Sequence, residues 1–194
     1  SAGCILAELS NDKKLEGLNL SEISEEFSCS PEEAAMRLYE ISEGSFVLHS
    51  MEEQDVDTIG MSDIIAVASD GNSLRNTGPL SNGKPHPRSY GTNTRFIEDM
   101  VVNKKKVSIS NAIYRMTSLP ASRIGLKNRG EIKKGYFADI NIFKPEELRE
   151  KATYVDPHQY STGMKWVLVN GKIALKDGKK IEGRFGKVVR SKEG

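Results

Sequence analysis

The side chains best suited to chemistry are a carboxylate and a group of polar residues that follows it along the chain. Asp70 lies in a Ser-Asp-Gly sequence directly after the apolar run at residues 64–68. The next loop, stiffened by prolines, carries His86, Arg88 and Tyr90. A buried strand that ends on an acid and a glycine places a carboxylate at its carboxyl end, where α/β sheets and barrels hold their reactive groups. Asp-Gly is also common in turns, so the alternative for Asp70 is a turn or helix cap.

The elements that must position this carboxylate are predicted to be alternating helices and strands. Apolar residues at helical spacing predict a helix over 20–27, and Ser-Pro at 30–31 followed by two acids is typical of the start of another. A short strand is predicted at 46–49 and a capped helix from residue 50. Together with a strand at 64–68, this order is that of a βαβ unit.

The remainder of the chain changes from helical to β-like character. Residues 71–91 are rich in Gly, Pro, Asn and Ser without periodicity, which predicts a long loop that is either functional or disordered. A helical pattern follows at 110–117. Further on, Asn-Gly at 170–171 between apolar runs predicts a β-hairpin with a type I′ turn. We therefore expect two domains, residues 1–128 and residues 129–194, the second of them rich in β-strands.

The composition gives no sign of a nucleic-acid or membrane partner. The 194 residues carry 28 Lys and Arg against 27 Asp and Glu, so the formal net charge of +1 offers no general attraction to polyanions. No apolar stretch approaches the ~20 residues that cross a bilayer. Cys4 and Cys29 form no Cys-x-x-Cys pair. So few cysteines indicate a reducing compartment, and we expect a cytoplasmic protein.

Several motifs along the chain resemble those of one enzyme family. Taken together they resemble the N-acyl-D-amino-acid deacylases (D-aminoacylases) of the amidohydrolase superfamily. The Gly-x-x-Ala-Asp and Val-Asn-Gly sequences are shared by many amidohydrolases, whereas His-Pro-Arg-x-x-Gly-Thr after Ser-Asp-Gly is more specific to the deacylases. The residues that carry the resemblance are 69–71, 86–92, 116–121, 135–139, 156–160 and 167–171.

The resemblance implies an α/β fold: the C-terminal part of a (β/α)₈ barrel, incomplete in this chain, with a small β-rich domain. It also implies roles for four residues. Asp70 matches the acid that takes a proton from metal-bound water and passes it to the leaving amine, and is a candidate metal ligand. Arg88 matches the clamp on the substrate's carboxylate, which a guanidinium binds with two parallel hydrogen bonds. Met51 matches a residue that lines the pocket for the substrate side chain. His86 is a candidate substrate contact, with a hydrogen bond inside the loop as its alternative.

Zinc is the cofactor that the resemblance implies, held in the family by residues of earlier barrel strands. His49, His86 and His158 do not have metal-site spacing, and a complete barrel needs about 250 residues. We therefore expect the C-terminal fragment of a metal-dependent hydrolase of N-acyl-D-amino acids, inactive as an isolated chain and without stoichiometric zinc. Its expected partners are the N-acyl-D-amino acid and either the missing N-terminal barrel portion or further copies of itself.

Two other functions are compatible with the motifs. A related amidohydrolase that acts on a cyclic amide, like the dihydroorotases and hydantoinases, is the alternative within enzymes. A non-catalytic module that completes a barrel supplied by another polypeptide is the alternative outside them. A substrate panel that separates acyclic from cyclic amides tests the first, and the mass in solution tests the second.

Overall fold

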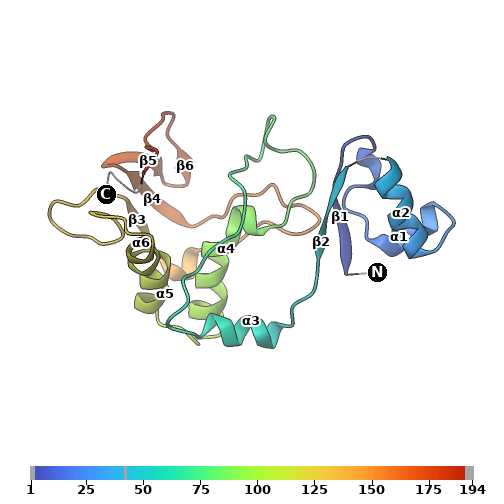
Figure 1. Cartoon of the computed structure of the whole chain (residues 1–194). Coiled ribbons are helices and arrows are strands. Elements are labelled where there is room, and N and C mark those ends of the chain that lie inside the picture. The colour runs from blue at the N-terminus through green and yellow to red at the C-terminus, as the bar shows by residue number, and fades with distance from the viewer. Residues whose placement is uncertain (1–2, 42, 191–194) are drawn as a thin grey trace. The chain divides into compact units, whose positions relative to one another are not determined.

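The computed structural model describes residues 3–41 and 43–190, which form two compact units (Figure 1). The first unit consists of the described residues within Ser1–Glu53, Asp70–Gly91 and Lys151–Tyr160. The second consists of those within Gln54–Ser69, Thr92–Glu150 and Ser161–Gly194. The predicted division at residues 128 and 129 does not coincide with these units and stays a prediction for the domains of the intact protein.

The first unit is built on two antiparallel strands that are far apart in sequence. β1 (Cys4–Leu9) pairs with β2 (Gly44–Leu48), with a register shift between Leu6 and Glu8. The chain between them forms the 3₁₀ turn η1 (Lys13–Leu15) and the helices α1 (Leu20–Glu26) and α2 (Pro31–Ile41). A small apolar core joins the strands to the helices; its buried members are Leu6, Leu9, Leu15, Ile23, Ala34 and Leu38.

Side-chain caps fix where both helices begin. Asn19 accepts hydrogen bonds from the N–H groups of Ser21 and Glu22, and the Glu22 carboxylate accepts from the Asn19 N–H at 2.7 Å. These reciprocal bonds satisfy three backbone N–H groups at the start of the helix that would otherwise lack partners. Ser30 Oγ accepts from the Glu33 N–H at 3.2 Å, with proline as the first helical residue. The two helices confirm the predictions for this region, and β2 confirms the strand predicted at 46–49.

The second unit contains most of the remaining helices. α3 (Glu53–Gly60) comes first. α4 (Arg88–Phe96), whose last five residues belong to this unit, continues directly into the π-helix η2 (Ile97–Asn103). α5 (Ile109–Met116) confirms the helix predicted at 110–117, and Ser108 caps it by accepting from the Asn111 N–H. α6 (Ser118–Arg123) and the 3₁₀ turn η3 (Pro145–Glu147) complete the helical part.

A four-stranded antiparallel sheet forms the rest of the second unit. Its strand order is β3-β4-β5-β6, and its strands are β3 (Ile140–Phe143), β4 (Met164–Val169), β5 (Lys172–Lys176) and β6 (Lys179–Lys180). Asn170 and Gly171 form the β4–β5 turn with φ of 49° and 77°, the left-handed conformation that a type I′ turn requires. The predicted hairpin is therefore confirmed.

Asp139 joins this hairpin to the chain that precedes β3. One Asp139 oxygen accepts from the Asn170 N–H at 2.7 Å, and the other forms an ion pair with Arg129. Arg129 also donates to Asn170 Oδ1 at 2.7 Å and stacks over the Phe137 ring at 4.2 Å. The Ala-Asp and Asn-Gly motifs thus meet in one network, which we call the hairpin hub (Arg129, Asp139 and Asn170).

The apolar run at 64–68 is not a strand, and the predicted βαβ unit is wrong. β2 pairs antiparallel with β1, whereas the Val67 N–H donates to the carbonyl of Arg115 at 3.0 Å. Ile64 is 77% exposed. Because a strand exists only as part of a hydrogen-bonded ladder, an apolar run forms one only where a neighbouring strand lies beside it. In the described part of the chain, none lies beside these residues.

Two predicted boundaries also differ. The helix expected from residue 50 begins at Glu53, and α4 begins at Arg88, inside the stretch expected to be a loop. The mixed α/β class itself is confirmed. None of the described helices is long and apolar enough to cross a bilayer.

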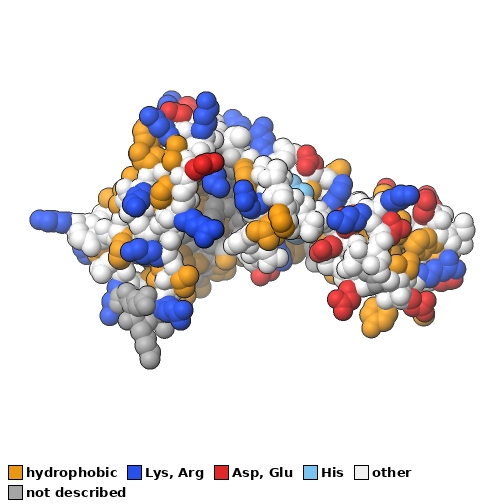
Figure 2. Space-filling view, turned by 90° about the horizontal axis from the view of Figure 1, so that it is seen from above, with side chains coloured by type: hydrophobic (Ala, Val, Ile, Leu, Met, Phe, Trp, Pro, Cys, Tyr) orange, Lys and Arg blue, Asp and Glu red, His pale blue; other side chains and the backbone are white. Residues whose placement is uncertain are grey.

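Large apolar side chains remain on the surface of both units. Tyr39 of α2 is 89% exposed and Ile132 of the second unit is 86% exposed. Figure 2 shows apolar side chains interspersed with Lys and Arg over the face in view. Scattered exposed apolar groups are common, so they do not define a binding surface by themselves.

The hairpin hub yields a stability prediction. We expect Asp139→Ala to lower the free energy of unfolding by about 1–2 kcal/mol, because it leaves the Asn170 N–H without its acceptor and Arg129 without its counter-ion. Urea unfolding measures the change. The matched control is Glu147→Ala, which removes an exposed ion pair with Lys144 in the same unit and should cost less. Equal losses of unfolding free energy in the two variants would contradict the stabilising role of the hairpin hub.

Candidate active site

The Ser-Asp-Gly and His-Pro-Arg motifs come into direct contact in the first unit. A Cβ on Gly71 would lie 2.8 Å from Ser89 Cα and 3.2 Å from the Arg88 carbonyl oxygen, so only glycine allows this approach. The Asn72 N–H donates to Ser89 Oγ at 3.3 Å. Asp70 has φ of 47°, a left-handed conformation that Asp tolerates better than most residues. The turn at 70–72 is therefore seated on the first residues of α4.

This contact places two opposite charges together. Arg88 Nη2 lies 2.9 Å from Asp70 Oδ2, and the two side chains are 44% and 86% exposed. An ion pair so open to solvent contributes little to stability. Both groups remain accessible, and a guanidinium has donors enough to bind a second carboxylate. The pair can therefore supply a proton acceptor and an anion clamp side by side.

His86 fixes the start of the helix that carries Arg88. Its Nδ1 accepts from the Arg88 N–H at 3.0 Å, so in the neutral ring Nε2 carries the proton and donates to the Tyr154 hydroxyl at 3.2 Å. The Tyr154 ring packs against His49 with centroids 4.2 Å apart. The structure thus gives His86 the loop hydrogen bond that was its alternative. Tyr154 was missed because it lies far along the chain in an unremarkable sequence.

A second tyrosine–histidine contact holds the loop between the two motifs. The Tyr90 hydroxyl lies 2.7 Å from His158 Nδ1 and donates to the Arg75 carbonyl at 2.9 Å. His158 Nε2 lies 2.8 Å from the Gly83 carbonyl oxygen. Burial raises the pKa of Tyr90, which keeps its hydroxyl protonated. These hydrogen bonds hold the loop against His158, which belongs to the first unit and not to the β-rich part of the chain.

Met51 lies apart from these contacts. It follows β2 in the segment before α3, and its side chain is 63% exposed. The role that the resemblance implies for Met51 stays a prediction.

The donors of the first unit fit one position of a metal site and not a complete one. Asp70 offers an accessible carboxylate. Both ring nitrogens of His86 and of His158 are engaged by protein groups. Among the described residues, Asp70 does not belong to a group of three or more His, Cys, Asp or Glu side chains that could hold a metal, so a metal there would need further ligands.

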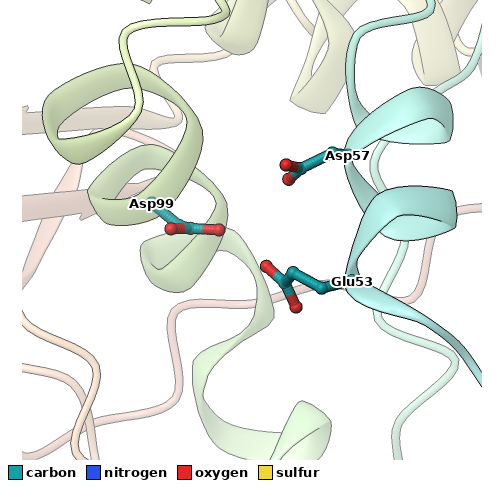
Figure 3. A group of neighbouring side chains, drawn as sticks. All are labelled: Glu53, Asp57 and Asp99. Atoms are coloured by element: carbon teal, nitrogen blue, oxygen red, sulfur yellow. The ribbon is translucent and has the colours of Figure 1, made fainter.

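A separate acidic group is neutralised by lysines. Figure 3 shows Glu53 and Asp57 on α3 and Asp99 on the π-helix. Lys104 Nζ lies 2.7 Å from Asp57 and 2.9 Å from Asp99, and Lys106 Nζ lies 2.6 Å from Asp57. Hydrogen bonds from the two lysines lower the pKa of Asp57. Because the lysines already supply positive charge, this group is a structural ion-pair network.

Comparison with known proteins agrees with this geometry. The amidohydrolase family model matches residues 78–175, about half of the chain. An N-acyl-D-aspartate deacylase from Alcaligenes xylosoxydans xylosoxydans is 33% identical over 156 residues, which are 80% of this chain and 29% of that protein. The chain therefore belongs to the amidohydrolase family and, within it, to the D-aminoacylase group.

Two solved structures show the same fold. A D-aminoacylase with a binuclear metal centre superposes with a TM-score of 0.83 at 27% identity, covering 95% of this chain and 37% of that one. An N-acyl-D-glutamate deacylase from Bordetella bronchiseptica, complexed with zinc and a phosphonate mimic of the tetrahedral intermediate, superposes with a TM-score of 0.82 at 29% identity. It covers 97% of this chain and 38% of that one. The chain spans well under half the length of these relatives.

The seating of Gly71 yields a mutational prediction. We expect Gly71→Ala to lower the free energy of unfolding by about 1–3 kcal/mol, because the new Cβ meets backbone that cannot move aside like a side chain. Thermal or urea unfolding measures it. Gly186→Ala is the matched control, since a Cβ there meets nothing within 4 Å. A Gly71→Ala protein as stable as the control would show that the two motifs are not in contact.

The lysine network yields a prediction about pH. The pKa of Asp57 lies below its ordinary value of 3.8 in the folded protein. The ion pairs therefore stabilise the fold fully above about pH 4, and this contribution is lost as the pH falls through the lowered pKa. We expect Asp57→Asn to unfold at lower urea concentration at pH 7, with the difference from the unsubstituted protein shrinking below pH 4. A difference that does not change with pH would contradict the assignment.

Proposed function

We propose that the protein containing this chain hydrolyses N-acyl-D-amino acids to a carboxylic acid and a D-amino acid with the help of a bound metal ion. The observation that carries the proposal is the accessible Asp70–Arg88 pair, formed where the two family motifs meet. The names of the relatives support it, since they are deacylases of N-acyl-D-amino acids. An acyclic substrate of this class carries a free carboxylate, which is the group that Arg88 is suited to bind.

In this proposal Arg88 binds the substrate and Asp70 transfers the proton. Arg88 holds the substrate's carboxylate through two parallel hydrogen bonds and so orients the scissile amide. Asp70 accepts a proton from the attacking water at a carboxylate oxygen and delivers it to the nitrogen of the leaving amine. His86 keeps Arg88 in place through the first N–H of α4. Water gains a bond to the acyl carbon as the C–N bond breaks, so no further reactant is needed.

The metal is proposed to be zinc, held by residues outside this chain with Asp70 as a candidate ligand from within it. When bound, zinc supplies Lewis acidity that polarises the acyl oxygen and lowers the pKa of water. We propose that the isolated chain neither binds zinc stoichiometrically nor turns over substrate. The incomplete set of donors around Asp70 supports this proposal for the isolated chain, and the zinc in the structure of the N-acyl-D-glutamate deacylase supports the choice of metal.

The fold proposal follows from the unpaired run at 64–68. We propose that these residues form the last strand of a (β/α)₈ barrel when the rest of the barrel lies beside them, and that the β3–β6 sheet belongs to the small β-rich domain. The exposure of Ile64 supports it, since a barrel strand would bury that side chain. Association with the remaining barrel is favoured over self-association, because only the former completes the site at Asp70.

A pair of variants in the full-length, zinc-loaded protein tests the function. We expect Asp70→Asn to lower kcat by about 10²–10⁴-fold with little change in KM, because the amide keeps the turn but cannot accept the proton. We expect Arg88→Lys to raise KM about tenfold or more, because a lysine cannot form both hydrogen bonds. Steady-state kinetics with an N-acyl-D-amino acid measures both.

The matched control is Asp177→Asn, the same substitution at the same φ of 47° in the β5–β6 turn. It should leave both constants unchanged. Undiminished turnover by Asp70→Asn would remove that residue from catalysis. Faster hydrolysis of hydantoins or dihydropyrimidines than of N-acyl-D-amino acids would favour the cyclic-amide alternative. No turnover of any of these amides by the unsubstituted protein would favour the non-catalytic module.

A further inference from the structure

A buried guanidinium in the second unit has no role in the chemistry described above. Arg115, on α5, is 1% exposed and is among the largest fully buried side chains in the described chain. Its Nε donates to the Ile65 carbonyl at 2.7 Å and its Nη1 to the Gly60 carbonyl at 2.5 Å. Its guanidinium carbon lies 5.1 Å from the centre of the Phe96 ring.

Burying the Arg115 guanidinium costs free energy, and its hydrogen bonds must offset that cost. Within the described residues, Arg115 has no carboxylate at ion-pair distance; Asp63 attracts it from further away. Burying a charge without a close counter-ion is unfavourable, and an apolar side chain of similar volume usually costs less. Methionine would fill the same space. The guanidinium is therefore explained by what it alone supplies, which is several donors held rigidly in a plane.

The groups that Arg115 binds belong to the run that leads to Asp70. Gly60 is the last residue of α3, where a cation also complements the negative end of the helix dipole. Ile65 lies within the apolar run, and the Val67 N–H donates to the carbonyl of Arg115 itself at 3.0 Å. One residue thus binds residues 60–67 at three points, through its side chain and its backbone. Asp70 follows Val67 by three residues.

We propose that Arg115 is a positioning residue for the hydrolysis, which holds the chain at 60–67 so that Asp70 is delivered to the reacting atoms. The inference rests on the proposed function and deepens it. A displacement of about 1 Å at a catalytic group can cost on the order of a hundredfold in rate. The Arg88 N–H is held by His86, a contact that involves neither residues 60–67 nor the turn at Asp70, so loss of Arg115 acts on kcat and leaves KM nearly unchanged.

The test compares Arg115→Met and Arg115→Lys in the full-length, zinc-loaded protein. Methionine keeps the volume and removes every donor; lysine keeps the charge and restores one hydrogen bond. The expected kcat falls about a hundredfold for Arg115→Met and about tenfold for Arg115→Lys, with KM within about twofold. Hydrogen exchange followed by mass spectrometry gives a readout independent of activity, and amides of residues 64–70 should exchange faster in both variants.

The matched control is Leu119→Ala on α6, which opens a cavity at a buried apolar residue and removes no hydrogen bond from residues 60–67. It should lower the melting temperature while kcat and exchange at 64–70 stay as in the unsubstituted protein. The proposal is overturned if the control loses as much kcat as Arg115→Met. It is also overturned if the Arg115 variants change KM and not kcat. Unchanged kcat in a folded Arg115→Lys protein overturns it as well.

If neither Arg115 variant folds, Arg115 is required for folding of the second unit, and the positioning role is also overturned. The proposed function fails separately, when the unsubstituted protein does not hydrolyse N-acyl-D-amino acids. In that case hydrogen exchange still decides whether Arg115 holds residues 64–70.

Discussion

The close approach of Gly71 to the backbone of Ser89 is the contact on which the candidate site depends. It is a steric constraint: a Cβ at position 71 would overlap backbone atoms that α4 holds in place. Asp70 and Arg88 are separated by a long loop, and they form an ion pair because the turn that follows Asp70 lies directly on the first residues of α4. The glycine of Ser-Asp-Gly is thus required for packing, and the acid beside it is left exposed to solvent.

Local features of the fold could be predicted because neighbouring residues determine them. The helix that begins at Pro31 is set by its serine cap, and the β4–β5 turn is set by Asn-Gly, whose left-handed conformations few residue pairs adopt. The run at 64–68 has the composition of a buried strand, yet pairing with another strand is a property of what lies beside it. Its sequence could not reveal that Arg115 holds its backbone in this structure, through both its side chain and its own carbonyl.

In the candidate site, too, some features could be predicted from the sequence and others depend on contacts between distant residues. Asp70 and Arg88 could be found from residue type, spacing and resemblance, because carboxylates and guanidinium groups have few chemical equivalents. The residues that orient them could not. His86, a candidate substrate contact with a loop hydrogen bond as its alternative, accepts from the first N–H of α4 and has Tyr154 on its other nitrogen. A tyrosine at that distance in sequence has no local signal, and only the folded chain brings it to the histidine.

The openness of the Asp70–Arg88 pair follows from what the site is proposed to bind. A buried ion pair would resist exchange of partners, because removing one charge leaves the other desolvated and alone. An exposed pair contributes at most about 1 kcal/mol, so an incoming carboxylate can replace Asp70 on the guanidinium at little cost. The same replacement leaves the Asp70 carboxylate without its cation and beside the bound substrate. Substrate binding and the freeing of the proton acceptor are then one event, which requires that both groups stay accessible to solvent, as they are in this structure.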